Sequence, residues 1–224
     1  MTRNDDAARE RVVEELKERI ITGALPPGQR LRERTLSASF GVSRVPIREA
    51  LFALESQRLV WSEPRRGAFV TALTLTDVHE LFDVRAALEP LVGRLAAERR
   101  TDGDIAVLTA DFAAEKAAAG VGDLKAGSLA NSDFHHHLLL SSHNRLLVSI
   151  GSPLNLQIQR LFRRTIDGHE EELCQAHGAM LAAVVDHNVA LAGQIATGHV
   201  EETRQRSLDA ADQEQLHTRS RTRV

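Results

Sequence analysis

The stretch around Gly41 constrains this chain most, because it joins two short helical segments through a tight turn. Residues 35–40 have the pattern of a short helix that ends at the glycine, and a second helix begins at Val42 and Ser43 and continues to about Gln57. Ser43 is suited to cap this second helix, since its hydroxyl can accept a hydrogen bond from a free backbone amide. The two segments have the length and turn chemistry of a helix-turn-helix.

Flanking segments complete a small N-terminal domain. Apolar residues recur at helical spacing over residues 10–21, and Gly23 with a Pro-Pro-Gly run ends that helix. After the second short helix, residues 59–62 and 68–72 have the pattern of two strands around a Pro/Gly turn. Residues 1–73 are therefore predicted to form three helices and a β-hairpin, which is a winged helix-turn-helix.

Arginines at two points of this domain suggest contact with DNA. Arg44 and Arg48 are four residues apart and point outward together when the apolar face of their helix packs inward. Arginine makes bidentate hydrogen bonds with guanine in the major groove. Arg65 and Arg66 occupy the hairpin tip, which is thin enough to enter a minor groove. Surface arginines can also merely solubilise a small domain, but the consecutive order of cap, paired arginines and basic turn favours DNA binding.

Charge and composition set broad limits on the function. Residues 1–73 contain 13 Lys and Arg against 10 Asp and Glu, and the remainder contains 15 against 21, so a polyanion is expected to meet the N-terminal domain. No apolar run approaches the roughly 18 to 20 residues of a membrane span, and the charged start lacks the apolar core of an export signal. The single cysteine, Cys174, excludes a disulfide framework. A cytoplasmic protein without a membrane partner is expected.

Residues 74–224 follow helical periodicity almost throughout. The first helix is expected to begin at Thr76 and to run to about Arg99. Breaks divide the rest at residues 101–103, 120–122, 144, 168 and 187–188. The chain is thus predicted to be mainly α, with the winged domain followed by an all-α antiparallel bundle of six or seven helices.

Histidines are the conspicuous polar residues of this second region. His135, His136 and His137 are consecutive, and adjacent side chains on a helix point about 100° apart, so they cannot all face one site. His135 shares an apolar face and is predicted to point inward, whereas His137 lies with polar residues and is predicted to point into water, with His136 between them. The same test places His177 and His199 on the apolar faces of later helices.

Three inward histidines on separate helices favour a shared metal site. A single inward histidine is more often a core imidazole satisfied by a neighbour. Three imidazoles with one oxygen donor suit zinc, and nickel or manganese remain open. Asn131, one turn before His135, is placed to supply the oxygen.

Arg85 lies in the middle of the apolar stripe of the helix expected at residues 76–99. A buried guanidinium needs an anion, because burying an unpaired charge is costly. Glu89, four residues further on, can supply it. The carboxylate of a bound ligand, held bidentately, is an equally good partner.

The N-terminal motifs form a recognisable series. In order they are Gly23, Pro27-Gly28, Leu31, Glu33-Arg34-Thr35-Leu36, Gly41 to Arg44, Pro46 to Leu51, Leu59-Val60 and Arg65 to Gly67. This series closely resembles the winged helix-turn-helix of the GntR family of bacterial transcription regulators. The resemblance implies that Arg34, Ser43, Arg44 and Arg48 contact DNA, with Arg44 reading a base, and that Arg66 and Gly67 lie at the wing tip. Arg58 stands where the family usually has glycine, which implies a left-handed backbone or a shifted helix cap.

The helical region carries a second, looser series. It comprises Leu81 to Arg85, Leu88 to Pro90, Phe134-His135 with Leu138 and Asn144, His177 with Leu181, and His199. This series resembles the FCD domain of FadR-type GntR regulators, in which three histidines and an aspartate bind a metal beneath a pocket for a small organic acid. The resemblance implies that His135, His177 and His199 are metal ligands. The aspartate position is Asn131 here, a neutral amide.

The leading hypothesis is a homodimeric DNA-binding transcriptional regulator. Its helical domain, residues 74–224, would bind a divalent metal and a small organic acid held by Arg85, and the acid would modulate binding to a short, near-palindromic operator. A metal-responsive regulator without an organic effector is an alternative. A histidine-liganded metallohydrolase is a lesser one, because no inward carboxylate is predicted beside His135 and an enzyme would not need the basic head. We therefore expect that the protein is not an enzyme.

Overall fold

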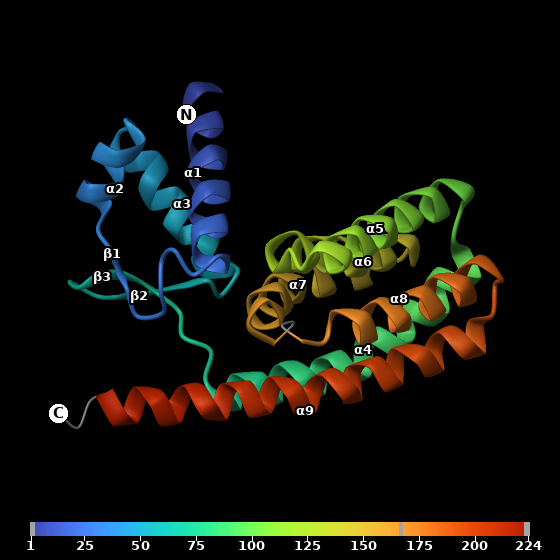
Figure 1. Ribbon diagram of the computed structural model, residues 1–224. Helices are drawn as coiled ribbons and strands as arrows, with labels where there is room; N and C mark the ends of the chain where they lie inside the picture. The colour runs from blue at the N-terminus through green and yellow to red at the C-terminus, as the bar shows by residue number, and fades with distance from the viewer. Residues whose placement is uncertain (1–2, 166–167, 222–224) are drawn as a thin grey trace. The chain divides into compact units, whose positions relative to one another are not determined.

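The computed structural model describes residues 3–165 and 168–221, with side chains in residues 6–162 and 168–209. The chain divides between Leu73 and Thr74 into two units, which we call the head and the body. Helices dominate both units, as predicted for a mainly α chain (Figure 1). Among the described helices, none combines the length and the apolarity needed to cross a membrane.

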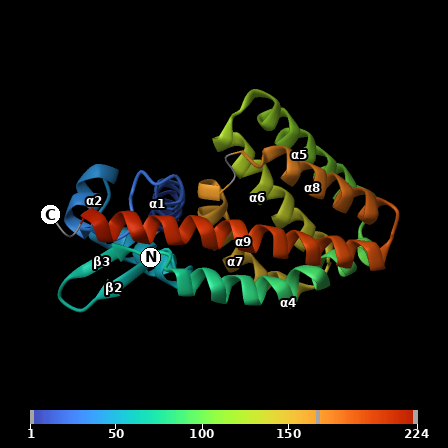
Figure 2. The same cartoon turned by 60° about the horizontal axis from the view of Figure 1, so that its bottom comes forward.

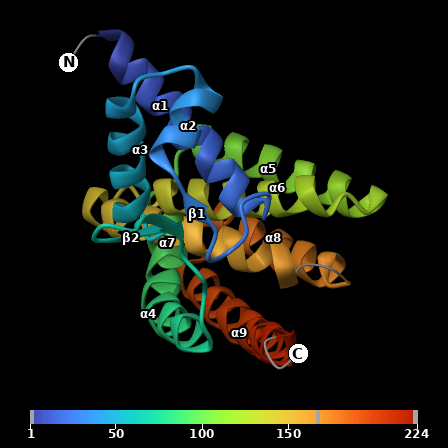
Figure 3. The same cartoon turned by 90° about the vertical axis from the view of Figure 1, so that its left-hand side faces the viewer.

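The head packs its three described helices around a small apolar core. They are α1 (Arg3–Ile21), α2 (Glu33–Phe40) and α3 (Arg44–Ser56). The first and the third lie side by side, and α2 contacts α3 (Figure 3). The buried side chains are Val12, Leu16 and Ile20 from α1, Leu36 from α2, and Ile47, Ala50, Leu51 and Leu54 from α3. This burial leaves the Arg44–Arg48 face of α3 in solvent, as the helical period predicted.

A three-stranded antiparallel sheet closes the head. Strands β2 (Val60–Glu63) and β3 (Gly67–Val70) form the predicted hairpin, with Trp61 opposite Phe69. The prediction of a two-stranded hairpin was incomplete, because β1 (Arg30–Leu31) pairs with the other edge of β3. A strand of two residues is too short to show an alternating pattern, and only the pairing with β3 defines it.

The turn between α2 and α3 confirms one prediction and corrects another. Gly41 ends α2 in the left-handed conformation, with φ 65°. Ser43 occupies the N-cap position of α3 but makes no capping hydrogen bond. Pro46 removes one of the two amides that could donate to this cap, because it lies three residues after Ser43 and has no N–H. At the other end of α3, Arg58 adopts φ 57°, so the residue that replaces the family's glycine does take the left-handed conformation.

The described part of the body contains six helices, within the predicted six or seven. They are α4 (Leu75–Arg99), α5 (Asp102–Val121), α6 (Leu124–Ser141), α7 (Arg145–Thr165), α8 (Glu170–Val185) and α9 (Val189–Arg221). The start of α4 was predicted at Thr76, but Thr74 is the cap. Its hydroxyl accepts from the Asp77 amide while the Asp77 carboxylate accepts from the Thr74 amide, which is a reciprocal capping box.

Helices α4 and α9 run alongside each other for much of their length (Figure 2). Their contact depends on Gly93, since a β-carbon there would lie 2.8 Å from the carbonyl oxygen of Ala192. The body core is built from apolar residues of α4, α5, α6, α7, α8 and α9, among them Val92, Leu108, Phe134, Leu138, Leu147, Met180, Val184 and Ala196. The histidine-bearing faces of α6, α8 and α9 turn toward this core.

Candidate metal centre and nucleic-acid surface

Three histidines from three helices converge in the body. His135 comes from α6, His177 from α8 and His199 from α9. Their ring centroids are separated by 4.9, 5.1 and 5.1 Å, and one ligand atom from each lies within 4.8 Å of the others. The Nε2 atoms of His135 and His177 are 3.2 Å apart. Residues that are 42 and 22 positions apart in sequence are therefore brought to one point.

Burial keeps His135 and His199 in the neutral form that a metal requires. His177 and His199 are 2% and 6% exposed. Burial, followed by the influence of His177, lowers the pKa of His135 to about 3, and burial also lowers the pKa of His199 well below its usual value. A neutral imidazole offers a lone pair to a cation. His199 Nε2 is buried and has no hydrogen-bond partner among the described residues, which fits a centre that would hold zinc or a similar borderline ion.

Asn131 and a residue that sequence reasoning missed, Glu115 of α5, stand beside this centre. Asn131 is 1% exposed and its Nδ2 donates to Glu115 Oε1 at 3.3 Å. The other oxygen, Oε2, lies 2.7 Å from His177 Nδ1. The expectation that no inward carboxylate accompanies His135 was wrong, because it considered only the helix that carries His135. Leu108 and Ala118 share the buried face with Glu115, and that spacing was the available signal.

His136 and His137 lie outside the centre, as the helical period predicted. His137, however, does not point freely into water. Its Nδ1 lies 2.6 Å from Asp111 Oδ2 on α5, and its side chain is 34% exposed. His136 is half-buried, and burial lowers its pKa, with a further lowering from His137. The prediction failed for His137 because a neighbouring helix supplies an acid that the period of α6 cannot reveal.

Arg85 is buried in the body and pairs with half-buried Glu89, one of the two partners that the sequence allowed. Its side chain is 1% exposed, and its Nε donates to Glu89 Oε1 at 2.5 Å. Burial opposes ionisation of Glu89, but Arg85 and the nearby histidines lower its pKa overall. The guanidinium also lies over the rings of Phe82 and Phe162. Its Nη2 atom is buried without a hydrogen-bond partner among the described residues, so one donor remains for a further acceptor.

A cavity of about 50 Å³ joins the histidines to Arg85. Its polar lining consists of Arg85, Glu89, His135, Asn155, His177 and His199. Asn155 of α7 was not singled out in the sequence, and its Nδ2 is another buried donor without a partner among the described residues. Apolar side chains such as Leu138, Ile158 and Met180 form the remaining wall. The cavity thus combines neutral imidazoles with unpaired donors suited to an anionic ligand.

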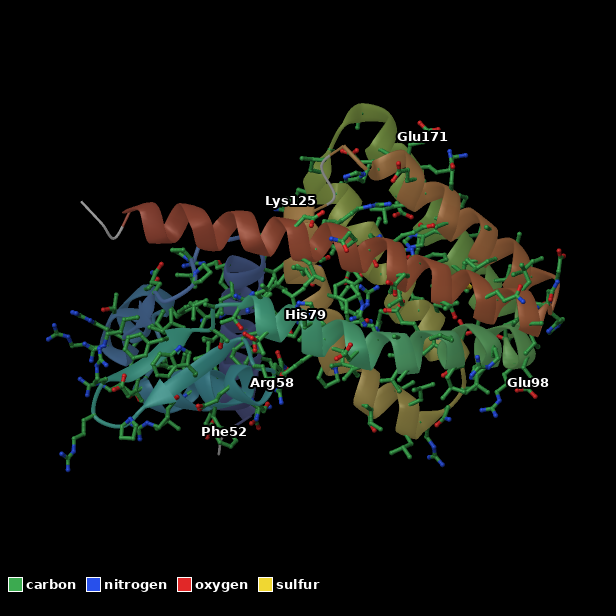
Figure 4. All side chains as sticks on the ribbon, turned by 90° about the horizontal axis from the view of Figure 1, so that it is seen from below. Phe52, Arg58, His79, Glu98, Lys125 and Glu171 are labelled. Carbon is green, nitrogen blue, oxygen red and sulfur yellow. The ribbon has the colours of Figure 1, made fainter. Side chains whose placement is uncertain are left out.

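The head presents its arginines on α2, α3 and the wing. Arg34, Ser43 and Arg44 are exposed. Arg48 is also exposed, but its Nε and Nη2 donate to the two oxygens of Glu33 at 3.2 and 3.1 Å. Exposed Phe52 follows Arg48 by one turn of α3 (Figure 4).

The wing tip is formed by Arg65, Arg66 and Gly67. Arg65 and Gly67 have φ angles of 67° and 92°, so both take left-handed conformations in the turn. Arg66 pairs with Glu63 at 2.7 Å. A surface groove between α3 and the wing is also lined by Arg30 and Arg32, which sequence reasoning did not assign. Their proximity depends on β1, the strand that the sequence did not predict.

Comparisons with known proteins agree with this two-part architecture. Residues 8–70 match the model of the bacterial regulatory proteins of the gntR family, and residues 80–202 match the FCD domain. The HTH-type transcriptional regulator YdhC of Bacillus subtilis is 32% identical over 189 residues, covering 83% of this chain and 84% of YdhC. The galactonate operon transcriptional repressor of Escherichia coli is 30% identical, covering 78% and 86%.

Solved structures show the same fold. A GntR transcriptional regulator from Rhodococcus sp. RHA1 superposes with a TM-score of 0.78 at 24% identity, covering 91% of this chain and 99% of that one. Escherichia coli McbR/YncC gives a TM-score of 0.76 at 23% identity, with 92% and 98% covered. The head is the family's DNA-binding unit and the body is its FCD domain. The chain therefore belongs to the GntR family, in its FadR-like branch, and is a DNA-binding transcriptional regulator and not an enzyme.

Proposed function

We propose that this regulator binds its operator as a homodimer and that its body, residues 74–224, holds a divalent metal and a small organic acid that modulates DNA binding. One observation carries the proposal: three imidazoles, two of them buried and that of His135 half-buried, converge on a cavity that also contains a guanidinium nitrogen without a partner among the described residues. Metal and acid would therefore occupy one enclosed space. A regulator of bacterial DNA acts in the cytoplasm, on the nucleoid.

The ligand set favours zinc, with nickel or manganese as alternatives. His135, His177 and His199 supply three nitrogen donors, and Asn131 would add its amide oxygen. Because Asn131 Nδ2 donates to Glu115, Oδ1 is the amide atom that is left to coordinate a cation. A bound metal would supply a positive charge that attracts the carboxylate of the effector into the cavity.

The chemistry of the cavity favours a small acid with further hydrogen-bond acceptors. Buried donors need acceptors, and Arg85 Nη2 and Asn155 Nδ2 both lack one among the described residues. A cavity of about 50 Å³ accommodates roughly four waters at 10–15 Å³ each, so the effector is small. Relatives named for the gluconate and galactonate operons support a carboxylate as the effector's charged group, because both names denote sugar acids.

In the head, we assign direct DNA contact to Arg34, Ser43, Arg44 and Arg48, and minor-groove contact to Arg65, Arg66 and Gly67. Two such heads in a dimer would read a short, near-palindromic operator. Replacing Arg44 by Ala is expected to weaken operator binding by about 1–3 kcal/mol and to relax base preference at one position of each half-site. A gel-shift series on operator variants measures both effects, and undiminished binding would contradict the assignment.

Metal and effector binding can be tested together on the full-length protein. Purified wild-type protein is expected to contain one divalent metal per chain by elemental analysis, and His177→Ala is expected to lose it. His136→Ala is the matched control, because His136 adjoins the centre in sequence but does not enter it, and it should retain the metal.

Thermal unfolding in the presence of single small acids then tests the effector. An acid at 100 times its dissociation constant stabilises the folded state by about 2.7 kcal/mol. The same acid should alter operator affinity in the wild type and have a blunted effect in His177→Ala. If DNA affinity responds to metal alone and to no acid, the protein is a metal sensor. A wild-type protein that takes up no metal would refute the metal centre.

A further inference from the structure

Glu115 is a buried carboxylate that forms no ion pair with a lysine or arginine among the described residues. Its side chain is 3% exposed. Helix α5 packs against both α6 and α8, which carry two of the three histidines. The described donors to Glu115 are an amide, Asn131 Nδ2, and an imidazole nitrogen, His177 Nδ1. Burying a carboxylate without a compensating charge is costly. A nearby positive charge would therefore stabilise Glu115.

The two contacts of Glu115 fix the tautomer of one histidine of the centre and the orientation of the Asn131 amide. When Glu115 accepts a hydrogen bond from His177 Nδ1–H, the lone pair of that ring resides on Nε2, the atom that lies 3.2 Å from His135 Nε2. When Glu115 accepts from Asn131 Nδ2, it fixes which end of the amide remains free. One carboxylate thus orients one nitrogen donor and one oxygen donor.

The charges around the centre explain why this carboxylate is needed. A metal would be held by uncharged groups, since imidazoles coordinate a metal as neutral ligands and Asn131 is an amide at the position where the resemblance places an aspartate. The charge of Glu89 is compensated by Arg85. Among the described residues, Glu115 is thus a carboxylate beside the centre without an arginine or lysine partner. It lies behind the ligand residues and not among them, since it contacts His177 through Nδ1, the nitrogen that does not face His135.

We propose that Glu115 is the outer-sphere anchor of the metal centre, a positioning residue that orients His177 and Asn131 and supplies the negative charge that Asn131 lacks. The inference rests on the proposed metal function. Outer-shell carboxylates that hold a ligating histidine contribute substantially to metal affinity. In this chain the carboxylate lies on α5, and the ligand position on α6 carries a neutral amide.

Zinc affinity measured by competition with a chromophoric chelator tests the proposal. Glu115→Gln preserves shape and can still accept a hydrogen bond, but it removes the charge, and it is expected to weaken zinc binding about 10- to 100-fold. Asp111→Asn is the matched control, because Asp111 lies one turn earlier on α5 and makes a similar carboxylate–histidine contact with His137, outside the centre. It should bind zinc as the wild type does.

A rescue variant distinguishes the loss of negative charge from a loss of folding in Glu115→Gln. In Glu115→Gln with Asn131→Asp, the carboxylate returns to the ligand position, and zinc affinity should recover most of the loss. Wild-type affinity in Glu115→Gln, or failure of the double variant to recover while remaining folded by circular dichroism, would overturn the role of Glu115. A wild-type protein that binds no zinc, nickel or manganese fails the proposed function itself, so the two failures are distinguishable.

Discussion

The head and the body each contain an arginine–glutamate pair. The two pairs consist of the same residue types but differ in their exposure to solvent and in their hydrogen bonds. Arg48 on the head is 70% exposed in its side chain and makes two hydrogen bonds to Glu33. Arg85 in the body is 1% exposed and makes one hydrogen bond to Glu89.

Exposure decides what each pair can do. An exposed pair contributes about 0–1 kcal/mol, so a DNA phosphate can displace Glu33 from Arg48 at little cost. A buried pair cannot be separated without leaving a charge uncompensated. Arg85 is thus committed to Glu89, and its remaining Nη2 is available to an internal ligand. The same two residue types therefore form an exchangeable outer contact in the head and a fixed inner one in the body.

Removing each arginine is the strongest test of this contrast. Arg85→Met leaves the half-buried Glu89 without its cation and is expected to destabilise the body by about 3 kcal/mol, the lower end of the range for a buried pair. Arg48→Met should change the free energy of unfolding by less than about 1 kcal/mol. Urea unfolding of the metal-free protein, followed by far-ultraviolet circular dichroism, measures both. Equal losses of unfolding free energy would contradict the distinction between the two pairs. If Glu89→Leu restores stability to Arg85→Met, the loss comes from the unpaired carboxylate.

DNA affinity tests the exposed pair, because Arg48 is expected to matter more for DNA binding than for stability. Arg48→Ala is expected to weaken operator binding by about 1–3 kcal/mol if Arg48 contacts a base, or to reduce the salt dependence by about one ion if it contacts a phosphate. Arg94→Ala, an exposed arginine of the body, is the control and should leave binding unchanged. Fluorescence anisotropy with labelled operator at several salt concentrations separates these outcomes.

Glu33→Gln should have a smaller effect and the opposite sign. The variant removes a negative charge that competes with phosphate for Arg48, so binding to non-operator DNA is expected to strengthen and its salt dependence to become steeper by at most about one ion. Specificity for operator over non-operator DNA would fall. Unchanged non-operator binding at low salt would mean that Glu33 does not compete with DNA.

Acidic pH gives the smallest expected effect. The hydrogen bond from Arg48 lowers the pKa of Glu33 below its ordinary value of 4.5. The unfolded chain then binds this proton more readily than the folded chain, so the stabilisation is present above about pH 4.5 and is lost as the pH falls further. The difference in melting temperature between wild type and Glu33→Gln should therefore shrink on acidification. A difference that persists unchanged at pH 3 would assign it to another cause.

Residues whose roles depend on one helix or one turn could be predicted from the sequence. The period of α6 distinguished inward His135 from its neighbours, and Gly41 and Arg58 were identified at positions that take left-handed backbone. Contacts between helices were different. The pairing of His137 with Asp111 and the position of Asn155 depend on how separate helices pack, which no single periodicity encodes.

Glu115 shows the same limit at the candidate centre. A lone glutamate on the apolar face of α5 was visible in the sequence, but nothing local to α5 indicated that it would meet residues of α6 and α8. The proline three residues after Ser43 removes one possible donor to that cap, and this loss could have been anticipated from the sequence.

The stacking of Trp61 on Phe69 has a practical consequence. The rings lie 4.8 Å apart on β2 and β3, and Trp61 is 43% exposed. The chain contains one tryptophan and no tyrosine. Indole fluorescence therefore comes from the head alone, because the body contains no tryptophan. Trp61 is thus an intrinsic fluorescent probe on the β2–β3 hairpin, and its emission can report DNA binding without an added dye.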